Sequence, residues 1–199
     1  MGRTFRYRKS RKSQRNLLKE SPSPHIHHDL LKFLVAHGWR NENHLTVSSF
    51  KETGRGLYAK RDIVEHDVLI EMPIECMISI ITLESDEKFM ELFEVEKFDG
   101  LKAKLSFQSL LAFYLSYHKE LDEKSQWSEY IKTLPDTFST PYFCKKSELY
   151  YLPDNLLKMV VNQHNSIKSQ FEIIRKMLKE EAHFDTFKWA YFAVNSRSV

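Results

Sequence analysis

The sequence is short of the residues that mark several protein classes. It has two cysteines, Cys76 and Cys144, in different segments and without metal-ligand spacing, which argues against a disulfide framework and a zinc site. No apolar run approaches the length of a membrane span, and no secretory signal opens the chain. These absences predict a protein of the cytoplasm or nucleus with no membrane partner.

What the chain does contain is typical of a globular fold. Its 199 residues include 42% hydrophobic and 29% charged residues, enough to bury a sizeable core. Residues 1–20 differ from the rest, because they contain eight Lys or Arg and a single acidic residue, Glu20, which gives a net charge of +7. We expect residues 1–24 to form a basic disordered tail and linker, and residues 3–19 to make weak contacts with nucleic acid or to act in nuclear import. A solvated arm without a partner is the alternative.

Two glycines stand in a short polar turn between strand-like segments. The run 45–50 is β-branched and partly alternating, and the apolar runs 67–71 and 76–81 follow the turn at 53–56. Gly54 and Gly56 admit unusual backbone angles and close approach by another group. A hairpin turn alone explains a Gly-x-Gly, and no third glycine or following helix completes a dinucleotide site. The spacing therefore predicts a small antiparallel meander.

Apolar residues recur at helical spacing through most of the rest of the chain. A helix is expected from His25 to its stop at Gly38, with Ser23 as cap and Pro24 in the first position. Further helices are predicted at 84–95, from Ser106, around 127–134, from Asp154 and from Asp185. These apolar stripes are interpreted as core, and His118 and His164 as hydrogen-bonded core histidines. His25, His27 and His28 are read as a polar helix start, not a metal site, so no metal ligand is predicted.

Four blocks in order resemble one family. They are GRGLYAKRDI at 54–63 with VLIEMP at 68–73, WSEYIKTLP at 127–135, STP at 139–141 and WAYFAVNSRSV at 189–199. Together they resemble the SET domain of protein-lysine methyltransferases, in the class of Rubisco methyltransferase. The resemblance runs from about residue 32 to the last residue. It implies an α+β fold in which an N-terminal β meander precedes a mostly helical SET insertion, within residues 25–199 (25–81 helix plus meander, 82–199 insertion).

The same resemblance implies the chemistry. The family binds S-adenosylmethionine and methylates a protein lysine, on a histone or another protein. Thr53, Gly54 and Arg55 match the turn whose backbone holds the cofactor, and Arg197 matches an arginine near it. A guanidinium facing the cofactor's carboxylate is suitable chemistry for that position, although a surface arginine at a helix end is the alternative.

The match also has a gap. Relatives continue into an Asn-His motif and a catalytic tyrosine, and neither is located here, so no catalytic residue is predicted. We expect a truncated chain that is inactive alone. A second hypothesis remains open: a non-catalytic interaction protein whose basic arm contacts nucleic acid or chromatin.

Overall fold

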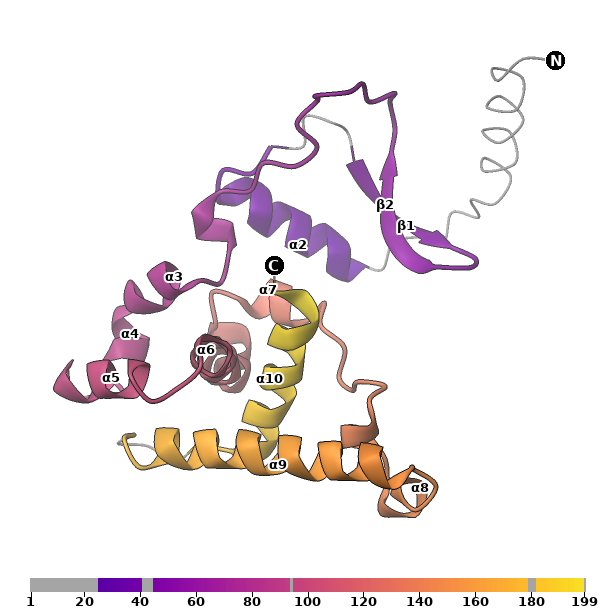
Figure 1. Cartoon of the computed structure of the whole chain (residues 1–199). Coiled ribbons are helices and arrows are strands. Elements are labelled where there is room, and N and C mark those ends of the chain that lie inside the picture. Colours follow the sequence, from indigo (N-terminus) through magenta and orange to yellow (C-terminus); the bar gives the residue numbers. More distant parts are fainter. Residues whose placement is uncertain (1–24, 41–44, 94, 179–181, 199) are drawn as a thin grey trace. The chain divides into compact units, whose positions relative to one another are not determined.

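The computed structural model describes residues 25–40, 45–93, 95–178 and 182–198, shown in Figure 1. The chain divides into two compact units, residues 1–76 and 77–199, which are described separately below. The basic tail and linker predicted at 1–24 lie outside the described residues. The domain boundaries of the sequence analysis stay a prediction. No helix in the described ranges combines the length and apolar character needed to cross a membrane.

The first unit opens with helix α2, His25–Ala36. Gly38 ends the helix with φ +88°, in the left-handed region that favours glycine. The backbone N–H of Gly38 donates to the carbonyl of Val35 at 3.1 Å, and that of Trp39 to the carbonyl of Leu34 at 3.0 Å. These two bonds form a Schellman motif, so the predicted stop at Gly38 is confirmed. The predicted cap, Ser23 with Pro24, lies outside the described residues.

An antiparallel hairpin follows, made of β1, Leu45–Phe50, and β2, Gly54–Ala59. The register runs from Leu45 opposite Ala59 to Phe50 opposite Gly54. Gly54 has φ +76°, and a Cβ added at Gly56 would lie 3.0 Å from the ring of Phe50. The first glycine therefore permits the turn, and the second makes room for an aromatic ring across the strands.

The sheet has two strands, which is fewer than the meander predicted from the sequence. The run 67–71 forms no strand, and Val68 and Leu69 are 67% and 55% exposed. The run 76–81 is also not a strand, because Cys76 ends a short 3-10 helix, η1 (Ile74–Cys76), and Ile80 and Ile81 begin α3. The α+β fold class is confirmed, since helices dominate and the hairpin supplies the strands.

The second unit is helical. Its elements are α3 (Ile80–Glu84), α4 (Glu87–Met90), α5 (Val95–Lys102), α6 (Phe107–Leu121), η2 (Asp122–Lys124), α7 (Ser128–Ile131), η3 (Pro141–Phe143), α8 (Lys146–Leu149), α9 (Asp154–Arg175) and α10 (Phe184–Arg197). The predicted helix 84–95 is wrong as one element, because the chain breaks into α3, α4 and the start of α5. The side chain of Asp86 accepts from the N–H of Phe89 at 3.1 Å and so starts α4 as a separate helix.

Helix α6 is the centre of this unit. It starts at Ser106 as predicted, and Ser106 caps it by accepting from the N–H of Ser109 at 3.2 Å. Residues 109–116 are all buried. A helix that is buried on all sides needs neighbours on all sides. Helix α10 packs against α6, and α9 packs against α10, where the rings of Phe171 and Phe187 lie 5.5 Å apart (Figure 1).

Three predictions about α9 and α10 need correction. Asp154 begins α9 and Asp185 is the second residue of α10, but neither caps its helix, since the capping positions are Pro153 and His183. The carboxylate of Asp185 instead pairs with Lys188 at 2.6 Å. His164 is exposed, not in the core, because the first half of α9 projects beyond the packed helices (Figure 1).

Candidate functional site

The glycine turn is the first part of the predicted site. Thr53 and Gly54 are exposed, and a Cβ added at Gly54 would meet nothing within 4 Å. The backbone here is open to another molecule, and this room is what a ligand held by main-chain groups requires. Arg55 lies in β2 opposite Ser49. The geometry of the turn therefore fits the predicted cofactor contact, whose role stays a prediction.

Arg197 is the second part and belongs to the second unit. It is the last residue of α10 and is exposed, whereas Ala193 and Val194 one turn earlier are buried. Burial raises the pKa of the Tyr130 phenol, and the positive charge of Arg197 opposes that rise. The guanidinium thus lies near α7, on a helix end that the core holds in place.

A hydrogen bond joins two of the sequence blocks that pointed to a family. The indole Nε1 of Trp189 on α10 donates to the carbonyl of Pro135 at 2.8 Å. The ammonium of Lys119 on α6 lies 4.0 Å from the centre of the same indole ring. The blocks at 127–135 and 189–199 therefore meet on one side of the second unit. The helical spacing of the sequence predicted that the aromatic residues of these blocks lie in the core. It did not predict that Trp189 bonds to Pro135.

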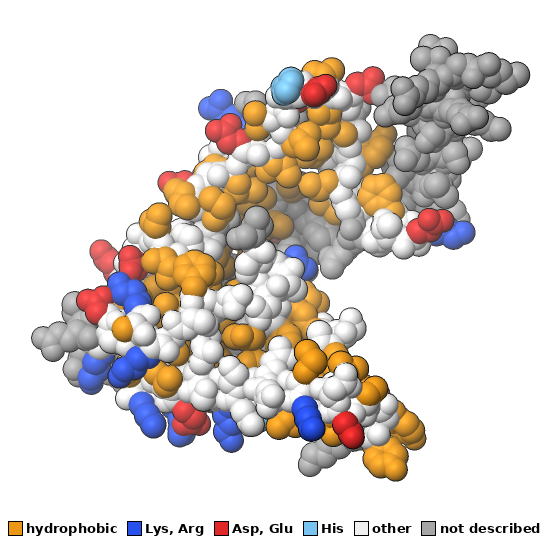
Figure 2. All heavy atoms as spheres, in the orientation of Figure 1, with side chains coloured by type: hydrophobic (Ala, Val, Ile, Leu, Met, Phe, Trp, Pro, Cys, Tyr) orange, Lys and Arg blue, Asp and Glu red, His pale blue; other side chains and the backbone are white. Residues whose placement is uncertain are grey.

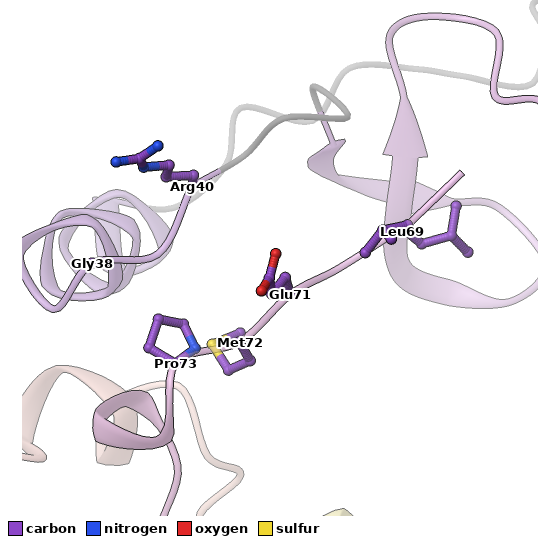
Figure 3. Close-up of a pocket in the computed structure, with 7 residues that line it drawn as sticks. Gly38, Arg40, Leu69, Glu71, Met72 and Pro73 are labelled. Atoms are coloured by element: carbon purple, nitrogen blue, oxygen red, sulfur yellow. The ribbon is translucent and has the colours of Figure 1, made fainter. Parts of the chain in front are cut away.

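The first unit has a cavity that the sequence analysis missed. It has a volume of about 470 Å³ and is lined by Gly38, Arg40, Val68, Leu69, Glu71, Met72 and Pro73. Figure 3 shows the segment 69–73 passing the end of α2, with the guanidinium of Arg40 extending away from Glu71. Because 67–71 was expected to be a strand, no cavity was predicted there.

Comparison with solved structures identifies the fold. The SET domain of LSMT bound to methyllysine and AdoHcy matches 86% of this chain and 39% of that chain, with a TM-score of 0.68 and 22% identity. Rubisco LSMT bound to sinefungin and monomethyllysine matches 85% of this chain, with a TM-score of 0.67 and 21% identity. The chain has a SET-domain fold.

Comparison with proteins of similar sequence agrees with this fold. This SET-domain chain is 27% identical over 175 residues to SET domain-containing protein 4 of Artemia parthenogenetica, covering 86% of this chain and 42% of that protein. It is 25% identical over 178 residues to the actin-histidine N-methyltransferase of Homo sapiens, covering 80% of this chain and 29% of that protein. No family model matches. The predicted resemblance to a SET domain is confirmed by this fold match and by the similarity to SET domain-containing protein 4.

This SET-domain chain spans less than half the length of the relatives that it matches. Within the described ranges, no group of three or more His, Cys, Asp or Glu is arranged to hold a metal ion. Cys76 and Cys144 are free thiols, and burial raises the pKa of Cys76.

Proposed function

We propose that this chain is part of a protein methyltransferase that uses S-adenosylmethionine and methylates a lysine side chain. The observation that carries the proposal is the SET-domain fold over 86% of the chain, shared with an LSMT structure that contains AdoHcy and methyllysine. AdoHcy is the demethylated form of S-adenosylmethionine. Homology to SET domain-containing protein 4 supports the same class of protein.

The residues of this chain would bind and orient the cofactor. When bound, S-adenosylmethionine supplies an electrophilic methyl group on a sulfonium ion. Thr53 and Gly54 are exposed and offer backbone N–H and C=O groups to a zwitterionic ligand without interference from a Cβ at Gly54, and the backbone of Arg55 follows them in β2. Arg197 offers a planar fork of donors that suits a carboxylate.

Lysine is the acceptor that we favour. The LSMT structures that match were solved with lysine, methyllysine or monomethyllysine. A histidine acceptor is the competing case, because several relatives are actin-histidine N-methyltransferases. An amine must be neutral to attack a methyl group, so an active site for lysine must favour the uncharged amine. Histone and non-histone proteins are both candidate substrates.

Calorimetry with S-adenosylmethionine and with S-adenosylhomocysteine tests the proposal. We expect the longest product of the gene to bind both ligands, and the 199-residue chain to bind them more weakly and to transfer little or no methyl group. Mass spectrometry of a methylated protein would then identify the acceptor residue. Absence of binding to both chains would refute the methyltransferase proposal, and methylhistidine without methyllysine would refute the lysine acceptor.

The basic arm favours a second function. Residues 1–20 carry a charge of +7, and we propose that residues 3–19 contact nucleic acid or chromatin and that the protein occurs in nucleus and cytoplasm. Such binding would be non-catalytic and would weaken steeply with salt. Deleting residues 1–20 is expected to abolish salt-sensitive retention on DNA. Retention that is unchanged by the deletion would contradict this proposal.

A further inference from the structure

A half-buried carboxylate, that of Asp86, links two helices and a turn of the second unit. The Oδ1 atom of Asp86 accepts from the N–H of Phe89 at 3.1 Å and so caps α4. Its Oδ2 atom accepts from the hydroxyl of Tyr114 at 3.0 Å, from Nε2 of His118 at 3.1 Å and from the side-chain amide of Gln126 at 3.2 Å. Asp86 therefore ties α4 to α6 and to the segment after η2.

The imidazole of His118 continues the network on its other side. Its Nδ1 atom lies 3.0 Å from the hydroxyl of Ser125, and that hydroxyl oxygen accepts from the backbone N–H of Trp127 at 3.0 Å. Because a carboxylate only accepts, Nε2 carries the hydrogen, and Nδ1 accepts the hydroxyl hydrogen of Ser125. A neutral His118 thus satisfies every partner in this arrangement.

A second proton on His118 conflicts with this arrangement. When Nδ1 is protonated, it becomes a donor and can no longer accept the hydroxyl hydrogen of Ser125. That hydroxyl hydrogen has no other acceptor among the described residues. His118 and Ser125 are only 3% and 5% exposed, so water cannot readily replace the lost bond. Burial lowers the pKa of His118, and the charge and hydrogen bond of Asp86 oppose the lowering without cancelling it.

Protons can reach the network from a hollow beside it. The hollow has a volume of about 370 Å³, and Asp86, His118 and Gln126 contribute to its lining. The other titratable or charged groups around it are Glu87 and Lys88 from α4, Lys124 from η2, and Tyr117 from α6. Tyr114 stays a protonated donor, because burial raises the pKa of its phenol.

We propose that Asp86, His118 and Ser125 form an acid-sensitive clasp, which holds the segment 125–127 on α6 at neutral pH and releases it when His118 is protonated. The direction in which stability changes with pH follows from the linkage between proton binding and folding. A histidine whose pKa is lowered by folding binds its proton more weakly in the folded state, so stability is present above the unfolded pKa of about 6.5 and falls as the pH drops below it. The unfolding equilibrium constant then rises by up to about tenfold for each pH unit below that point.

Unfolding in urea at pH 7.5, 6.5 and 5.5 tests the clasp. His118→Gln keeps one amide donor and one acceptor but does not titrate, so we expect its stability to change with pH less than that of the wild type, by up to about tenfold in equilibrium constant between pH 6.5 and 5.5. His164→Gln is the matched control, since His164 is exposed and bonds to Tyr142, and it should retain the wild-type pH dependence. Equal pH dependence in wild type and His118→Gln, or a wild type that gains stability in acid, would overturn the proposal.

Hydrogen exchange of the wild type gives a test that does not depend on the variant. After correction for intrinsic rates, the backbone amide of Trp127, which donates to the Ser125 hydroxyl, should lose protection at pH 5.5 before the amides of α10. Parallel loss at Trp127 and in α10 would mean that acid unfolds the whole unit at once, and the clasp would then be rejected even if His118→Gln failed to fold.

Discussion

Replacing Phe89 with alanine is expected to lower the free energy of unfolding of the second unit by about 3–5 kcal/mol, the usual loss for a buried phenylalanine. Phe89 is 1% exposed, on the short helix α4. Its ring lies 5.4 Å from that of Phe113, 5.0 Å from that of Tyr114 and 5.5 Å from that of Phe93. The loss is large because Phe113 and Tyr114 are fixed in the buried helix α6 and cannot close over the cavity that the missing ring leaves.

Urea unfolding followed by tryptophan fluorescence measures this loss. Phe107→Ala is the matched control, because it removes the same ring from a position that is 56% exposed at the start of α6. We expect the control to change stability by about 0.5 kcal/mol or less. If the two variants lose similar stability, the ring cluster around Phe89 is not the core of this unit.

Strong local patterns in the sequence were sufficient to predict some of the helices and strands. The strand 45–50 and the glycine turn after it were predicted because a β-branched run stood directly before a Gly-x-Gly. The start of α6 was predicted because Ser106 precedes a long apolar stripe and a serine at this position satisfies free backbone N–H groups. In both cases the residues that decide the structure are neighbours in the sequence.

Short apolar runs were not sufficient to predict strands. The run 76–81 resembles a strand in composition, but Ser79 and Thr82 form a capping box, in which each side chain accepts from the other residue's N–H at 3.3 and 2.8 Å. These two bonds start α3 and override β propensity. The run 67–71 shows the other limit: it is apolar but forms no strand, because composition alone does not specify pairing into a sheet.

The site was predictable only in part. The turn at 53–55 and Arg197 could be named from motif blocks, and the structure shows open backbone at Gly54 and an exposed Arg197. The bond from Trp189 to Pro135 and the network around Asp86 could not be predicted. Such contacts join residues tens of positions apart, and neither periodicity nor local motif spacing specifies which distant residues meet.

Replacing Arg197 with alanine is expected to weaken binding of S-adenosylhomocysteine by about tenfold to a hundredfold. A hydrogen bond to a charged group contributes about 1.5–3 kcal/mol, and each 1.4 kcal/mol corresponds to about a tenfold change in affinity. Arg197 is exposed at the end of α10, so its loss should leave the fold intact. Arg197→Lys keeps the charge but not the planar fork, and we expect an intermediate affinity.

Calorimetry on the longest product of the gene, for wild type and both variants, measures this effect. Arg175→Ala is the control: it removes another exposed arginine, which pairs with Glu172 on α9 at 2.7 Å. Its affinity should equal that of the wild type, because a surface ion pair on another helix contributes little to stability and nothing to the ligand. Equal affinity in wild type and Arg197→Ala would assign Arg197 to the helix surface, where a basic side chain merely complements the negative end of α10.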